Sequence, residues 1–187
     1  MTIAAFTTKA QGLLRAIYTE AGLSPADFTR AAGEAIPPPK SGSLRAIWDT
    51  GASGSVVSIE AANSVGLHAV GYTPVSTANG NYTAPIFVCD IYLPTGIVVP
   101  SVEMVGGSLG SDVDMLIGMD VITLGDFTIT NLGGDTWFTF RMPSMQRADY
   151  KAIPMPNENH RCPCGTVKHY KKCCQPLAKK ILAVAFK

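Results

Sequence analysis

One stretch of the sequence, IWDTGASGSVVS at residues 47–58, constrains the fold more than any other, because it places a carboxylate inside an apolar segment. Apolar residues lead directly into Asp49 and resume at Val56, so both flanks are expected to be buried. A carboxylate at the end of a buried strand is costly unless it is paired, solvated by a cleft or shares a proton. The stretch therefore predicts either a plain turn between two strands or a carboxylate held in a cleft.

The sequence around this turn is typical of an all-β unit of about 100 residues, running from Ser43 to about Pro143. Short segments rich in β-branched and aromatic residues alternate there with Gly, Pro and Asn. Asn131 to Asp135 supplies the turn glycines of a hairpin. We expect strands at residues 44–48, 56–59, 86–93, 96–105, 127–130 and 136–140, and a short turn or helix at 61–67.

The first 40 residues are expected to be helical. Apolar residues repeat there at helical spacing, at Leu13, Leu14, Ile17 and Tyr18. Ser24 followed by Pro25 resembles a helix start, with Ser24 as the N-cap. The segment IPPPK at residues 36–40 cannot continue a helix and is expected to be an extended linker. A packing or docking role is predicted for this segment.

Charge and cysteine content divide the chain into two chemically different parts. Residues 1–146 carry six Lys/Arg and twelve Asp/Glu, whereas residues 147–187 carry nine and two, together with four of the five cysteines. The stretch from Met142 to Asn159, with three prolines, joins the two parts. We therefore expect a helical segment with linker at 1–40, a β-domain at 41–143, a linker at 144–159 and a tail at 160–187.

The sequence IWDTGAS at residues 47–53 resembles the signature of the retropepsin-like aspartic proteases, which is two apolar residues followed by Asp-Thr-Gly-Ala-Ser/Thr. About 65 residues later that family has an apolar pair and a Gly under the catalytic turn, and MLIGMD at 115–120 is similar. Residues 76–81 lie where the family has its flap hairpin. The resemblance implies an all-β, closed barrel-type aspartic protease domain, here with a short helical N-terminal segment and a small zinc-binding C-terminal tail.

The resemblance also implies a role for each residue of the turn. In aspartic proteases, the known example of such a pair, two carboxylates about 3 Å apart share one proton because both cannot ionise. The ionised Asp49 takes a proton from a water that attacks the peptide carbonyl, and the protonated one donates to the carbonyl oxygen. Thr50 is expected to lock the turn through its hydroxyl, and Gly51 to let the backbone approach the substrate. Ala52 and Ser53 are expected to present backbone groups to the peptide, and catalysis needs no metal.

A pair of carboxylates requires two Asp-Thr-Gly turns, and this chain has one. Asp135 is followed by Thr and Trp, without the Gly, and Asp112, Asp114 and Asp120 have no such turn. The sequence therefore implies a homodimer in which each subunit supplies Asp49 on the two-fold axis. If the protein is monomeric, the same residues make an inert fold.

The flap is predicted from a single dipeptide, Asn79-Gly80, which is a strong hairpin-turn signal whatever the function. The functional interpretation is a lid that closes over an extended peptide and bonds to its backbone through Ala78, Asn79 and Gly80.

The tail reads CPCGTVKHYKKCC, and its four thiols can close around one tetrahedral Zn²⁺ through Cys162, Cys164, Cys173 and Cys174. A tail of this size needs the metal to fold. It resembles the SEC-C motif, with departures at Thr166-Val167 and Gln175. Its lysines give it a positive face, which is either plain solvated surface or a docking site for a protein or the ribosome.

These features predict a homodimeric aspartic endopeptidase acting on peptide or protein substrates, with a structural zinc tail for docking. The alternative is a non-catalytic peptide-binding adaptor on the same fold, and a weaker one is cleavage only of its own linker near residues 148–159. The intact Asp49 turn favours the enzyme, because a pure binder does not need that carboxylate. The sequence has no apolar run of the roughly 18 residues that a membrane helix needs. It also has no secretory signal, so we expect a cytoplasmic protein with no membrane partner.

Overall fold

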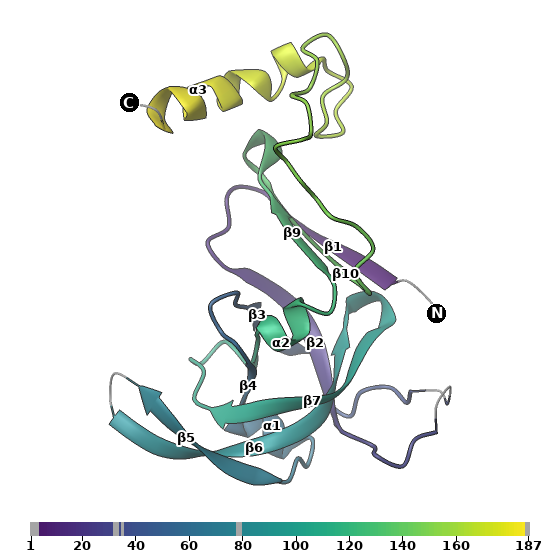
Figure 1. Ribbon diagram of the computed structural model, residues 1–187, viewed down its shortest axis with the longest axis vertical. Helices are drawn as coiled ribbons and strands as arrows, with labels where there is room; N and C mark the ends of the chain where they lie inside the picture. Colours follow the sequence, from purple (N-terminus) through teal and green to yellow (C-terminus); the bar gives the residue numbers. More distant parts are fainter. Residues whose placement is uncertain (1–3, 32–33, 35, 78–79, 186–187) are drawn as a thin grey trace.

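Two β-sheets and a small C-terminal tail make up the protein (Figure 1), in a computed structural model that describes residues 4–31, 34, 36–77 and 80–185. The strands are β1 (Ala4–Ala10), β2 (Ile17–Pro25), β3 (Leu44–Trp48), β4 (Ser55–Ser58), β5 (Gly71–Thr77), β6 (Gly80–Leu93), β7 (Ile97–Gly107), β8 (Met115–Ile117), β9 (Asp126–Thr130) and β10 (Thr136–Met142). The helices are α1 (Ile59–Ser64), α2 (Met119–Ile122) and α3 (Gln175–Ala185), with 3₁₀ turns at Pro94–Gly96, Leu132–Gly134 and Tyr170–Lys172.

The larger sheet closes into a barrel. Its strand order is β2-β3-β8-β4-β7-β6-β5, and β2 also pairs with β6, so six strands form a ring. Strand β2 divides its length between two partners, pairing with β3 through Ile17–Ala21 and with β6 through Gly22–Pro25. Strand β5 lies outside the ring and forms a long hairpin with β6 that extends away from the barrel (Figure 1). The predicted closed, all-β architecture is therefore confirmed.

The expectation of a helical N-terminal segment is wrong. Residues 4–10 and 17–25 are strands, and Ser24-Pro25 ends β2 instead of starting a helix. The apolar residues that suggested a helical face do not share one environment, because Ile17 is buried whereas Leu13 is 67% exposed. Pairing with β3, β6 and β10, all distant in sequence, overrides the weak local helical pattern.

A second sheet, in the order β1-β10-β9, packs against the barrel through aromatic side chains. The aromatic cluster consists of Phe6, Trp48, Phe127, Phe138 and Phe140. Trp48, the last residue of β3, lies at its centre, with ring centroids 5.0 Å from Phe138 and 4.9 Å from Phe140. Its indole Nε1 donates to Thr19 Oγ1 at 2.9 Å. One barrel residue therefore joins the two sheets, directly before Asp49.

The remaining predicted strands are present, and α1 begins two residues before, and ends three residues before, the turn or helix expected at 61–67. Strand β6 begins at Gly80, earlier than expected, because its first half pairs with β5. Helix α3 was not predicted, and it extends from the top of the molecule (Figure 1). In the part of the chain that the structure describes, no helix has the length and apolar character needed to cross a bilayer.

Candidate active site and candidate metal centre

The Asp49 turn, residues 49–54, begins where β3 leaves the barrel. The Asp49 amide donates to Ile117 O in β8 at 2.9 Å, which continues the parallel pairing of the two strands. The Asp49 carboxylate then folds back over the turn, where its Oδ1 accepts from the Gly51 amide at 2.8 Å. A Cβ atom at residue 51 would lie 3.1 Å from that oxygen, so glycine keeps the carboxylate uncrowded. The side chain remains half-exposed and can therefore meet water or a substrate.

Strand β8 supports the turn from below, as the sequence predicted for MLIGMD. Met119 N donates to Ala52 O at 2.8 Å, which ties the start of α2 to the turn. A Cβ atom at Gly118 would lie 2.5 Å from Gly54 O, a distance that real Cβ atoms do not adopt. Only glycine therefore allows the two segments to lie this close.

A hydrogen-bond network that the sequence analysis missed holds the far end of the turn. The buried Ser55 Oγ donates to Asp120 Oδ1 at 2.8 Å and accepts from Gly118 N at 3.0 Å. The Ser55 amide donates to Asp120 Oδ2 at 3.0 Å. Two sequence features could have indicated this network. Ser55 is a polar residue at the start of an apolar strand, and Asp120 is an acid two residues after Gly118. Asp120 acts here as a positioning residue for the turn.

The other predicted residues of the turn have different environments. Thr50 and Ser53 are exposed, and Ala52 is half-buried. The roles expected for the Thr50 hydroxyl and for the backbone of Ser53 stay predictions. Asp114, whose Oδ2 accepts from Arg45 N at 2.7 Å, has a structural role in joining β8 to β3.

The predicted flap is a hairpin formed by β5 and β6, paired from Gly71 with Ile86 to Thr77 with Gly80. Gly80 has a φ of +122°, a backbone conformation that favours glycine. Ala78 and Asn79, the other residues expected at the tip, lie outside the described residues. The role of the hairpin as a lid stays a prediction.

Four thiols of the tail gather at one point, which we call the metal knuckle (residues 160–174). Their Sγ atoms all lie within 4.8 Å of one another, with Cys164 to Cys173 at 3.5 Å and Cys173 to Cys174 at 3.8 Å. Thiolates around one tetrahedral zinc, each about 2.3 Å from the metal, are separated by similar distances. The residues present therefore fit a Zn²⁺ ion.

The electrostatics of the knuckle also favour a cation. Hydrogen bonds from the hydroxyl and backbone of Thr166, and then from Cys162, lower the pKa of the Cys164 thiol to about 6. Burial, and then hydrogen bonds with the neighbouring thiols, raise the pKa of Cys174 well above its usual value. Four crowded thiols cannot all ionise on their own, and a divalent cation removes that conflict.

Cys89 has no such role. Its thiol is fully buried in the barrel, and burial, followed by the neighbouring Asp90, raises its pKa to about 12. A thiol in this state is not a nucleophile at neutral pH.

Comparison with known proteins agrees with this geometry. Residues 41–121 match the family model described as aspartyl protease. A retropepsin-like aspartic protease from Rickettsia conorii is 18% identical and has a TM-score of 0.50, with 75% of this chain and 96% of that chain covered. EIAV protease in complex with the inhibitor HBY-793 is 16% identical with a TM-score of 0.41, covering 59% and 88%. No curated protein matches the sequence significantly. The resemblance predicted for the β-domain is confirmed, and the chain has the retropepsin-like fold.

Proposed function

We propose that the protein is an aspartic endopeptidase that works as a homodimer. The observation that carries the proposal is the Asp49 carboxylate, half-exposed at the end of β3 and held by Gly51 N at 2.8 Å on a retropepsin-like fold. One chain supplies one such turn. A second copy related by a two-fold axis would bring the second Asp49 beside the first.

In this dimer the two carboxylates share one proton. The ionised carboxylate accepts a proton from a water held between them, and the resulting hydroxide attacks the carbonyl carbon of the scissile peptide. The protonated carboxylate donates its proton to the carbonyl oxygen. As the tetrahedral intermediate collapses, the carboxylate that accepted the proton from water delivers it to the leaving nitrogen, the other carboxylate takes a hydroxyl proton from the intermediate, and the C–N bond breaks. Thr50 and Gly51 keep the turn in place, and Ala52 and Ser53 offer backbone groups to the substrate.

The substrate class that suits this arrangement is an extended peptide or protein segment. The β5–β6 hairpin extends beyond the barrel, and its tip, around residues 78–80, would close over the bound chain. A lid of this kind excludes water from the reacting groups and bonds to the peptide backbone, so it would accept many sequences.

The tail would bind one structural Zn²⁺ per chain through Cys162, Cys164, Cys173 and Cys174, as a SEC-C-type motif. Outside the metal ligands the tail is basic, and Lys168, His169, Lys171 and Lys172 line one exposed hollow. Such a surface favours an anionic partner, such as an acidic protein surface or the ribosome. We propose that the tail brings the protease to that partner in the cytoplasm.

The second candidate function is a peptide-binding adaptor without catalysis. The same barrel and hairpin would hold an extended peptide without using a carboxylate. Asp49 distinguishes the two candidates, since only the enzyme requires its ionisable group.

The decisive experiment is cleavage of a peptide library by wild type and by Asp49→Asn, with and without pepstatin. Asp112→Asn is the matched control, because it removes an exposed carboxylate from a loop outside the Asp49 turn. The proposal expects cleavage by wild type and the control only. It also expects a bell-shaped pH profile, because the rate vanishes when both carboxylates are protonated and again when both are charged. Equal, pepstatin-insensitive cleavage by Asp49→Asn would end the enzyme proposal.

A further inference from the structure

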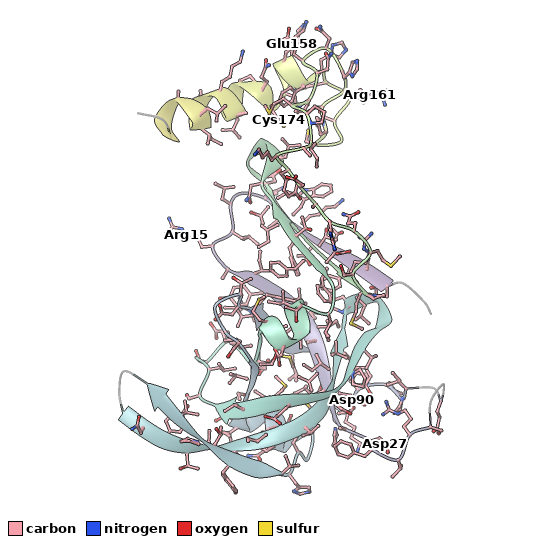
Figure 2. The ribbon with its side chains drawn as sticks, viewed as in Figure 1. Arg15, Asp27, Asp90, Glu158, Arg161 and Cys174 are labelled. Atoms are coloured by element: carbon pink, nitrogen blue, oxygen red, sulfur yellow. The ribbon has the colours of Figure 1, made fainter. Side chains whose placement is uncertain are left out.

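The metal knuckle is not separated from the rest of the molecule, although a linker of 16 residues, 144–159, leads to it. It lies against the tip of the β9–β10 hairpin, residues 131–135 (Figure 2). Figure 2 shows Cys174 on the side of the knuckle that faces this hairpin tip, with Glu158 and Arg161 on the outer side. A metal ligand, and not the exposed basic surface, therefore faces the hairpin.

The hairpin tip is shaped for this approach by two glycines. Gly133 and Gly134 have φ values of +79° and +91°, which the turn itself requires. A Cβ atom at Gly133 would lie 3.2 Å from Cys174 Sγ, and one at Gly134 would lie 3.5 Å from Leu177 Cδ2 in α3. At both positions without side chains, the knuckle or α3 therefore comes within contact distance of the hairpin.

A cavity of about 340 Å³ lies between the two surfaces. Leu132 and Trp137 line it from the hairpin, and Pro163 and Leu177 line it from the tail. Three of the four thiols, Cys164, Cys173 and Cys174, also face it. The four-cysteine cluster therefore borders the hairpin directly. A change in the positions of the cysteines would alter their contacts with the hairpin tip.

The hairpin tip is connected in turn to the Asp49 turn. Asp135 Oδ1 accepts from Gly12 N at 2.9 Å, and the buried Thr136 Oγ1 accepts from Leu14 N at 2.9 Å, so both fix the loop that follows β1. Further along β10, Phe138 and Phe140 pack on Trp48, which precedes Asp49. A well-ordered hairpin tip therefore also orders the β1-β10-β9 sheet, whose Phe138 and Phe140 pack on the residue before Asp49.

We propose that the hairpin tip is a docking surface for the metal-loaded knuckle of the same chain, so that metal binding stabilises the β1-β10-β9 sheet. The inference rests on the zinc binding proposed above. A ligand that binds only the folded and docked tail adds its binding free energy to the stability of the docked state. The hairpin ordered by docking is stabilised with it. Zn²⁺ would hold Cys174 in the closed ligand cluster that lies against Gly133, so the metal and the hairpin contact would stabilise the same arrangement.

The test is hydrogen exchange of the amides of residues 126–142, measured on the full chain with one equivalent of Zn²⁺ and after chelation. Zinc should slow exchange in the hairpin by about tenfold or more. Leu177→Asp should still bind one zinc per chain but lose this protection, because it places a charge against the hairpin tip. Leu182→Asp, on an exposed part of the same helix, should behave as wild type.

Three outcomes would overturn the inference in distinguishable ways. Stoichiometric zinc with unchanged exchange in the hairpin would refute docking and leave the metal site intact. Absence of zinc binding under reducing conditions would refute the metal site itself, and the inference with it. Protection that rises with protein concentration at full zinc occupancy would show that the knuckle of a second copy occupies the tip.

Discussion

The barrel and the metal knuckle are stabilised in different ways. The barrel and the β1-β10-β9 sheet packed on it share a continuous apolar core that runs from Phe6 in β1 to Phe140 in β10. The buried core of the knuckle consists of only Cys162, Tyr170 and Cys174. So few buried side chains cannot offset the entropy of ordering the surrounding loops. The barrel is therefore held by its own residues, whereas the knuckle is expected to depend on the Zn²⁺ proposed for its four thiols.

The largest expected effect separates the two regions by chemistry. Asp49→Asn should lower the peptidase rate by about 10²- to 10⁴-fold, because this is the usual contribution of a positioned acid–base group. It should leave the zinc content and thermal unfolding of the protein unchanged, since Gly51 N can still bond to the amide oxygen. Steady-state kinetics and metal analysis on the same sample check this. Full activity in the variant would mean that the chemistry lies elsewhere.

The next effect separates the two regions by folding. Cys162→Ser should release the zinc and unfold the knuckle, because metal binding supplies about 10 kcal/mol of the folding free energy of such a site. The barrel should stay folded, since none of its residues is a ligand, although the β9–β10 hairpin should become less protected. Limited proteolysis and NMR of the methyl groups would report on each region. A barrel that melts together with the knuckle would contradict the comparison.

Within the barrel, the close contact between Gly118 and the Asp49 turn should not tolerate an added methyl group. Gly118→Ala should reduce the free energy of unfolding by about 3 kcal/mol or more, because the new Cβ meets Gly54 O at 2.5 Å. Gly110→Ala is the control, since a Cβ there meets nothing within 4 Å. Urea unfolding measures both. Equal stability of the two variants would show that the segments at Gly118 and Gly54 can move apart freely.

A smaller effect is expected from the network at Ser55. Ser55→Ala leaves Gly118 N without its partner and removes one of the two hydrogen bonds to Asp120 Oδ1, which keeps that from Val121 N, at a cost of about 2 kcal/mol. Because the turn is loosened and not removed, kcat should fall while KM changes little. Ser53→Ala, on the exposed part of the turn, is the comparison for stability. A change confined to KM would place Ser55 in binding and not in positioning.

The smallest effect concerns the start of the linker, between the two regions. Hydrogen bonds from Ser144 Oγ and Met145 N, followed by those from Arg141, hold the pKa of Asp126 well below its usual range. The folded pKa is lowered, so this anchoring is fully present above the ordinary value of about 4 and is lost as pH falls toward the folded value. The protection factor of the Met145 amide, which is its exchange rate corrected for the intrinsic rate at each pH, should therefore fall below pH 4 by more than those of neighbouring loops. Asp126→Asn should show the loosened linker at neutral pH.

Features carried by local sequence could be predicted, and those carried by distant pairing could not. The Asp49 turn, the strand before it and the glycine beneath it follow from short motifs, and the spacing of the four cysteines anticipates their clustering. The N-terminal strands were missed because they pair with distant residues. Strand β1 pairs with residues of β10 that lie more than 100 positions away, and the end of β2 pairs with Cys89–Tyr92. Ser55 and Asp120 meet across 65 residues, and Gly133 meets Cys174 only in the folded chain.

The division of β2 between β3 and β6 has a consequence for synthesis on the ribosome. The barrel is closed by pairs between Gly22–Pro25 and Cys89–Tyr92, and β1 waits for β10, which ends at Met142. Strand β1 therefore emerges with open edges and must remain unpaired until β10 has been made, whereas β2 can pair with β3 early and with β6 once residue 92 has been made. A nascent chain that stalls before β10 would lack Phe138 and Phe140, and would leave the Phe6 and Trp48 rings without the partners that cover them.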